Sequence, residues 1–300
     1  MKIVKLKAGL GNQMFQYAFM RLLQVKYGIK DVRLDVSYFD SPNFRKYLES
    51  GIDLLNVEYK IAAREDLRQF HIPYNNRTPH TFSHRLVSAS QALFNSRYYY
   101  EKNRDYVNVE SILKYSYFDG YWQSWRYLEP IRDLILEEFK PKAGLSEKTN
   151  KYIEKFSALN YVFIGVRKGD YTESSKSTNH YGAPSLDYYK KAVPLVLERV
   201  KDPYFVIFSD DIEWVRNNID FNEAGISDNQ IEFRTEDRIV SNFEEMYVMA
   251  SCKHAIISNS TFNFWGAWMI DNPDKVIVAP KNWFKDGKPI DIIPPEWIQV

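Results

Sequence analysis

The C-terminal half of the chain alternates between short apolar runs and segments with helical spacing. The apolar runs predict strands at residues 161–166, 204–208, 231–233, 255–258 and 276–279. Helices are predicted between them, at residues 186–200, 212–219, 242–250 and 262–270. Because strands that are apolar throughout and joined by helices form parallel sheets covered on both faces, this half predicts a doubly wound, Rossmann-like α/β domain.

The N-terminal half begins in the same way, with strands predicted at residues 3–6 and 32–36. It becomes irregular between residues 71 and 117, where prolines and asparagines interrupt the pattern. Lys, Gly, Ser, Glu and Thr accumulate over residues 141–150, which is typical of a domain boundary. We therefore expect two α/β halves facing a cleft, with an N-terminal domain over residues 1–145 and a C-terminal domain over residues 146–300.

A glycine-bearing turn follows the first predicted strand, within the segment AGLGNQMFQY at residues 8–17. Gly9 and Gly11 break the strand, and an apolar run at helical spacing begins at Met14. Glycine lets a ligand approach the backbone, and a helix start offers free N–H groups, so such a turn suits an anion. It is not the dinucleotide fingerprint, because Met14 stands where the third glycine is required. On these residues alone, a plain structural turn is an equal alternative.

Composition excludes several classes of protein. A formal net charge of +1 argues against general nucleic-acid binding. The single cysteine, Cys252, excludes an internal disulfide and a cysteine-based zinc site. No run is long enough to cross a bilayer, and lysines interrupt the apolar N-terminal segment. We expect a cytoplasmic protein that can associate peripherally with the inner face of a membrane.

Polar residues follow three of the predicted C-terminal strands, in the segments RKGDY (167–171), SDD (209–211) and SNST (258–261). Ligands of open α/β sheets bind outside the carboxyl ends of the strands, which lie at one edge. A cationic pair, a carboxylate pair and a hydroxyl-rich helix start at that edge are what a nucleotide diphosphate needs. Arg167 can direct two N–H groups onto phosphate oxygens; the alternative is that it only pairs with Asp170.

Two of these groups also have structural interpretations. The hydroxyls at 258–261 are suited to capping the helix that follows, and capping uses the same N–H groups as phosphate binding. Asp210 and Asp211 suggest a metal, but Asp211 can equally cap the next helix. Divalent sites gather more oxygen ligands than this pair offers, so we expect no metal.

The segments together resemble the bacterial alpha-1,2-fucosyltransferase family (galactoside 2-alpha-L-fucosyltransferases). Six stretches carry this resemblance, in the family's order: Gly9–Ala18, Gly120–Ser124, Gly165–Tyr171, Phe208–Asp211, Glu244–Met246 and Ser258–Trp268. The resemblance implies a GT-B-like fold without a metal or resident cofactor. It also implies transfer of L-fucose, with inversion, from GDP-β-L-fucose to the 2-hydroxyl of a terminal β-galactoside on an oligosaccharide or lipid-linked glycan.

The resemblance also implies roles for individual residues. Arg167 meets the β-phosphate, Glu245 faces the guanine, and the turn 258–261 lies near the diphosphate. The full predicted donor site is Gly11, Asn12, Gln13, Arg167, Lys168, Asp210, Glu245, Ser258, Asn259, Ser260 and Thr261. The catalytic candidates are Arg167, Asp170 and Glu173. On the acceptor side we expect Asp35, His71, Trp122 and Gln123. Asp170, Glu173 and Asp35 are all candidates for the general base, and the sequence does not choose among them.

The chain departs from the family pattern at three positions. Gly165 stands where the family has histidine, Lys168 replaces an arginine, and Glu245 stands where aspartate is more frequent. Three alternatives therefore stay open: a GT-B transferase using GDP-fucose or GDP-mannose on another acceptor, a non-catalytic nucleotide- or sugar-binding protein, and a metal-dependent transferase using Asp210 and Asp211.

Overall fold

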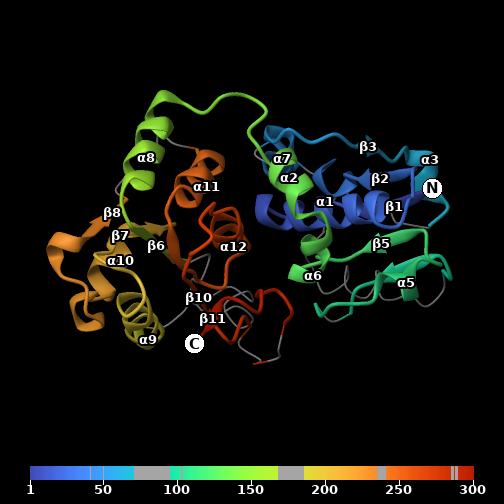
Figure 1. Cartoon of the computed structure of the whole chain (residues 1–300). Coiled ribbons are helices and arrows are strands. Elements are labelled where there is room, and N and C mark those ends of the chain that lie inside the picture. Colours follow the sequence, from blue (N-terminus) through green and yellow to red (C-terminus); the bar gives the residue numbers. More distant parts are fainter. Residues whose placement is uncertain are drawn as a thin grey trace. The chain divides into compact units, whose positions relative to one another are not determined.

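The computed structural model describes residues 1–40, 42–49, 51–70, 95–102, 104–167, 186–234, 241–284, 287 and 290–300. The chain divides into two compact units, each with its own parallel sheet (Figure 1). Unit 1 comprises Met1–Gly144 and Ile290–Ile292, and unit 2 comprises Leu145–Pro289 and Ile293–Val300. The predicted GT-B-like class, with two Rossmann-like α/β halves, is confirmed. Residues 290–292, which we placed in the C-terminal domain, group with unit 1.

The sheet of unit 2 has six parallel strands in the order β8-β7-β6-β9-β10-β11. The strands are β6 (Tyr161–Val166), β7 (Tyr204–Ser209), β8 (Ile231–Phe233), β9 (His254–Ile256), β10 (Ile277–Ala279) and β11 (Ile298–Gln299). Numbered within the unit this order is 3-2-1-4-5-6, the arrangement of nucleotide-binding doubly wound sheets. The order reverses between β6 and β9, so the carboxyl ends of these two strands form the topological switch point.

Helices cover both faces of this sheet (Figure 1). They are α8 (Glu147–Ala158), α9 (Leu186–Leu197), α10 (Ile212–Asn218), α11 (Asn242–Ala250) and α12 (Thr261–Trp268), with the short 3-10 helices η4 (Asn222–Ala224) and η5 (Asp228–Gln230). Val162 and Ile164 share a core with the apolar face of α9. Phe163 points to the opposite face, towards Gly266 of α12. The predicted elements of this half are confirmed with ends shifted by at most three residues, and α8 and β11 were not predicted.

The sheet of unit 1 has five parallel strands in the order β3-β2-β1-β5-β4. They are β1 (Lys2–Lys5), β2 (Val32–Asp35), β3 (Lys60–Ile61), β4 (Tyr98–Tyr100) and β5 (Tyr117–Asp119). The order reverses between β1 and β5, which places a second switch point at their carboxyl ends. Our expectation of an irregular region up to residue 117 was wrong at β4, a three-residue strand built from consecutive tyrosines.

The main helix of unit 1 is α1 (Leu10–Val25), which begins directly after Gly9. Gly11 therefore lies inside the first helical turn and not in the preceding turn. The remaining helices are α2 (Pro42–Glu49), α3 (Arg64–Arg68), α5 (Val109–Ile112), α6 (Trp125–Leu128) and α7 (Arg132–Glu138), with η1 (Ser37–Asp40), η2 (Ile52–Leu54) and η3 (Glu129–Ile131). Phe19 of α1 stacks on Trp122 with ring centroids 3.8 Å apart, which fixes α1 against the segment after β5.

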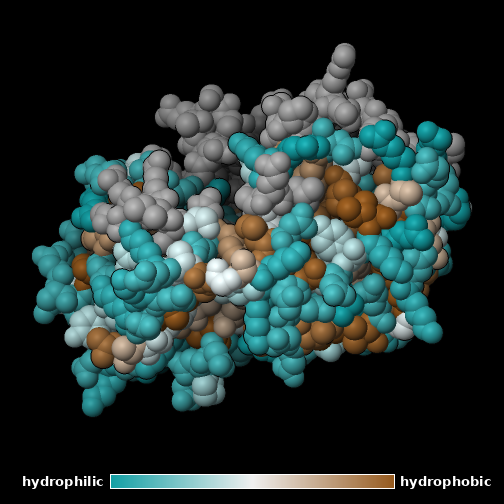
Figure 2. All heavy atoms as spheres, turned by 90° about the horizontal axis from the view of Figure 1, so that it is seen from above, coloured by the Kyte–Doolittle hydropathy of each residue, from teal (hydrophilic) through white to brown (hydrophobic). Residues whose placement is uncertain are grey.

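Hydrophilic side chains cover most of the described surface on the face seen in Figure 2, with hydrophobic residues in smaller separate areas. Within the part of the chain that the structure describes, none of the helices combines the length and the apolar character needed to span a membrane.

Candidate functional site

Arg167 lies at the switch point of unit 2, directly after β6. Its Nε lies 3.3 Å from Oδ2 of Asp210, which follows the neighbouring strand β7, and about half of the Arg167 side chain is exposed. Because an exposed ion pair contributes little to stability, Asp210 holds the arginine only loosely. The predicted pairing with Asp170 lies outside the described residues.

The other side of the switch point is formed by the turn after β9. Asn263 Nδ2 donates to Ser258 Oγ over 2.8 Å, and both side chains are buried. A Cβ built on Gly165 of β6 would come within 2.1 Å of Asn263 Nδ2. The glycine at the family's histidine position is therefore required here, because Asn263 occupies the space that a side chain on residue 165 would need.

Within the described part of the chain, the side chain of the N-cap residue does not bind the first N–H groups of α12. Ser260 stands at the N-cap, but its side chain makes no capping hydrogen bond. The first N–H groups of a helix have no partner within the helix and favour an anion. Ser260 and Thr261 are partly exposed, whereas the buried Asn259 donates through Nδ2 to the carbonyl oxygen of Trp283. The turn thus combines two anchoring residues with two that face outward.

Asp211 has a structural role. Its carboxylate accepts a hydrogen bond from the N–H of Trp214 and caps α10, which was the structural interpretation of this residue. Its neighbour Asp210 is the partner of Arg167. The two carboxylates therefore serve different partners.

Glu245 lies in the first half of α11. Burial raises the pKa of its carboxyl above the ordinary value, and the charge of Arg234 partly opposes this effect.

Four predicted site residues, Lys168, Asp170, Glu173 and His71, lie outside the described residues.

At the switch point of unit 1, Gln123 holds Asn12. Gln123 Nε2 donates to Asn12 Oδ1 over 2.7 Å, joining the segment after β5 to the first turn of α1. Two residues of this region have left-handed backbone, Ala8 with φ +66° and Trp122 with φ +58°. Non-glycine residues rarely adopt this conformation, and such strain is concentrated at functional sites.

The side chain of Gln13 joins three segments of unit 1 by hydrogen bonds. Its Nε2 donates to the carbonyl oxygens of Ala8 and Tyr47, each over 2.8 Å, and its Oε1 accepts from the N–H of Ile52. Both N–H groups of this buried amide are used inside unit 1, and its expected place among the donor-binding side chains stays a prediction.

Asp35 and Trp122, expected on the acceptor side, are also interior residues without exposed surface. The Asp35 carboxylate accepts hydrogen bonds from the hydroxyl of Tyr117 and from the N–H of Ser37. Trp122 packs on Phe19. Their expected place on the acceptor side stays a prediction.

Charged residues that the sequence reading missed surround the same switch point. Asp119, at the end of β5, lies 3.1 Å from Lys5 Nζ and 2.6 Å from Lys7 Nζ, with no exposed side-chain surface. Burial alone would raise the pKa of Asp119, but the charges of the two lysines outweigh it and hold that pKa well below its usual range. The rule that ligands bind at carboxyl ends of strands, applied to the N-terminal half as well, would have found this cluster.

Glu101, also missed, supports the segment that carries Gln123. Its buried carboxylate accepts from the N–H of Tyr121 over 2.6 Å and from the N–H of Trp122 over 3.2 Å. Burial raises the pKa of Glu101 to about 7, although these N–H groups and Lys7 act in the other direction. Glu101 thereby stabilises the backbone just before Gln123.

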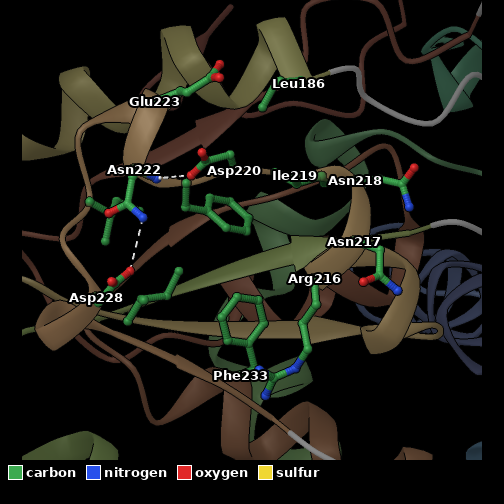
Figure 3. Close-up of a pocket in the computed structure, with 13 residues that line it drawn as sticks. Leu186, Arg216, Asn217, Asn218, Ile219, Asp220, Asn222, Glu223, Asp228 and Phe233 are labelled. Carbon is green, nitrogen blue, oxygen red and sulfur yellow. Dashed lines mark hydrogen bonds between the residues drawn. The ribbon is translucent and has the colours of Figure 1, made fainter.

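A cavity of about 480 Å³ lies beside β8, between α9 and the segment that follows α10 (Figure 3). Asn222 donates to Asp228 across its wall, and Arg216 lies over the Phe233 ring. None of the residues at the Arg167 switch point lines it, so the cavity is separate from the candidate site.

A strand order of 3-2-1-4-5-6 with an arginine and a helix start at the switch point is typical of nucleotide-binding α/β proteins. The chain belongs to glycosyl transferase family 11, whose model matches residues 1–300. It is a glycosyltransferase.

Two bacterial relatives match almost end to end. The O-antigen biosynthesis glycosyltransferase WbnK of Escherichia coli is 28% identical, over 98% of this chain and 99% of the relative. An alpha-1,2-colitosyltransferase of E. coli is 27% identical, over 99% and 98%. The galactoside alpha-(1,2)-fucosyltransferase 1 of Saimiri sciureus is 26% identical, over 60% of this chain and 51% of that protein.

Proposed function

We propose that this protein is an inverting galactoside 2-alpha-L-fucosyltransferase, which transfers L-fucose from GDP-β-L-fucose to the 2-hydroxyl of a terminal β-galactoside. The acceptor would be part of a glycan or surface polysaccharide under synthesis on the cytoplasmic side of a membrane. One observation carries the proposal: in a family 11 chain, the half-exposed Arg167 lies at the same switch point as the N-terminus of α12.

The leaving diphosphate is the group that this arrangement suits. Arg167 would bind the β-phosphate, and the N–H groups at Thr261 and its neighbours would bind the remaining oxygens. Donors placed where negative charge develops stabilise the transition state of such a transfer. No metal and no resident cofactor is needed in this scheme, because the arginine and the helix start offset the charge.

The chemical step would be a single displacement, in which the acceptor hydroxyl attacks C1 of fucose from the side opposite to GDP. A carboxylate would remove the hydroxyl proton, a contribution of roughly 10²–10⁴-fold in rate. Asp35 is enclosed, with its oxygens bonded to Tyr117 and Ser37. We therefore favour Asp170 or Glu173 as the base.

A second donor has specific support. One relative that aligns over 99% of this chain is named for colitose transfer, and colitose is fucose without its 3-hydroxyl. The second candidate function is therefore transfer of another GDP-linked sugar, colitose or mannose, to a different acceptor.

The test is release of GDP from GDP-fucose, GDP-colitose and GDP-mannose with a panel of β-galactosides, in the presence of EDTA. NMR of the product gives the linkage. Release from GDP-fucose with an α-1,2 linkage is the expected result. Preference for another GDP-sugar would establish the second candidate, and loss of activity in EDTA that Mg²⁺ restores would overturn metal independence.

A further inference from the structure

Arg234 follows β8 at the carboxyl edge of the unit 2 sheet, two strands away from Arg167. Its backbone N–H donates to the carbonyl oxygen of Ile207 in β7. Its Cζ lies 3.9 Å from the ring centroid of Tyr152 in α8 and 5.8 Å from that of Phe208 in β7. Contact with aromatic faces fixes the plane of a guanidinium group, so the direction of the Arg234 N–H groups is set by the fold.

Among the described residues, Arg234 Nη1 is buried and has no hydrogen-bond partner. Arg234 also makes no ion pair with any of these residues. Other arginines are paired, for example Arg21 with Glu138 and Arg33 with Asp66. A buried, charged donor without an acceptor costs free energy, so Arg234 has unused capacity for an acceptor other than the described residues.

Glu245 of α11 is the complementary group. The charge of Arg234 acts on its carboxyl, yet the two side chains form no ion pair with each other. The carboxylate makes no hydrogen bond to the described residues. A fixed cation and a carboxylate therefore lie within electrostatic range of each other, and both have unused hydrogen-bonding capacity.

The strand order places a nucleotide base near these residues. In sheets of this order the diphosphate lies at the first strand and the ribose at the second, which correspond to β6 and β7. Arg234 follows the third strand, β8, where the base is expected.

We propose that Arg234 binds O6 and N7 of the guanine of a GDP-sugar, beside Glu245, to which the family resemblance already assigns the N1–H and the exocyclic amine. This inference rests on the proposed function, because it names the residue that selects the donor's base. Arginine forms a bidentate pair with O6 and N7 of guanine, and a carboxylate only accepts. Adenine keeps N7 but carries an amine in place of O6, so the arginine would lose one of its two acceptors and face a donor instead.

The experiment is calorimetric titration of the full chain with GDP, IDP and ADP. IDP keeps O6, N7 and N1–H but lacks the exocyclic amine. Arg234→Ala is expected to lower the affinity for GDP and IDP by roughly ten- to hundredfold and to leave the affinity for ADP within about threefold. Glu245→Gln is expected to reduce the preference for GDP over IDP.

Arg216→Ala is the matched control, because Arg216 also lies over an aromatic ring, 4.3 Å from the centroid of Phe233, but lines the separate cavity. It should leave all three affinities unchanged. Arg234→Lys keeps the positive charge but loses the paired N–H groups of the guanidinium. It should therefore show the same selective loss of affinity for GDP and IDP, and it replaces the alanine variant if that variant does not fold.

An equal loss for all three nucleotides, or full GDP affinity in Arg234→Ala, would overturn this inference and leave the proposed function standing. Absence of GDP binding by the unaltered protein would overturn the proposed donor itself.

Discussion

Gln123 Nε2 donates to Asn12 Oδ1 over 2.7 Å, and this hydrogen bond fixes which way the Asn12 amide faces. With Oδ1 occupied, the Asn12 Nδ2 N–H groups are left to face away from Gln123. Glu101 supports the same segment through the N–H groups of Tyr121 and Trp122. The segment that follows β5 therefore holds the glycine-bearing turn of unit 1 in place, through the hydrogen bond from Gln123 to Asn12.

Asn12→Asp tests whether the amide N–H groups matter. An aspartate still accepts from Gln123, so the fold should be retained, but it cannot donate to a ligand. We expect kcat to fall at least about tenfold, as for loss of a hydrogen-bond donor in a transition state, with Tm within about 2 °C. Steady-state kinetics and thermal unfolding measure both. Turnover within twofold of the unaltered enzyme would show that Asn12 only shapes the turn.

Gly165→Ala should destabilise unit 2, because the new Cβ would lie 2.1 Å from Asn263 Nδ2. Overpacking of this kind costs about 1–3 kcal/mol. In the Asn263→Ala background the same change should cost at least about 1 kcal/mol less, since the clashing amide is absent. Urea unfolding of the single and double variants gives this coupling. Additive effects would mean that residue 165 is constrained by something other than Asn263.

Glu101 predicts a specific pH dependence of stability. Burial raises the pKa of Glu101 from 4.5 to about 7, so the folded state retains a proton that the unfolded state loses between these values. The contribution to stability is present below about pH 4.5 and is lost as the pH rises through 7. A shift of this size corresponds to about 3 kcal/mol.

Glu101→Gln should flatten the stability profile between pH 4.5 and 7, measured by urea unfolding at several pH values. Glu147→Gln, which alters an exposed carboxylate on α8, is the control and should not change the profile. Asp119 titrates in a different window: its pKa is lowered, so its contribution is lost only as the pH falls below about 4. A slope that persists in Glu101→Gln would assign the effect to another group.

Arg167→Ala should reduce kcat by roughly 10²–10³-fold, the usual cost of removing a donor to a developing oxyanion. Because the side chain is about half exposed, Tm should hardly change. Asp210→Asn removes the partner and keeps the arginine, so it should cost much less activity. Similar losses in both variants would show that the ion pair, and not phosphate contact, is what matters.

The sequence predicted unit 2 better than unit 1 for a physical reason. Strands such as β6 and β7 are six residues long and almost entirely apolar, so their pattern is unambiguous. The three-residue strands β4 and β5 carry too few residues for a period, and the pairing that defines them is non-local. Arg167 and Asp210 were predicted at one edge because the carboxyl ends of parallel strands meet there.

Side chains that carry hydrogen bonds across the fold could not be found in this way. Gln13 belongs to a recognisable motif, but only the structure shows that Tyr47 and Ile52 use its amide. The partnership of Gly165 with Asn263 spans two elements, and nothing local to either residue indicates it.

Unit 1 is not continuous in the sequence. The short segment Ile290–Ile292 belongs to unit 1, although it follows nearly all of unit 2 along the chain. Asp291 accepts from the N–H of Trp125 and pairs with Arg126. A fragment that ends at Gly144 would therefore lack part of its own fold. Recombination between relatives at a single point near that residue would exchange this segment together with unit 2, so chimaeras within the family should retain the parental residues at 290–292.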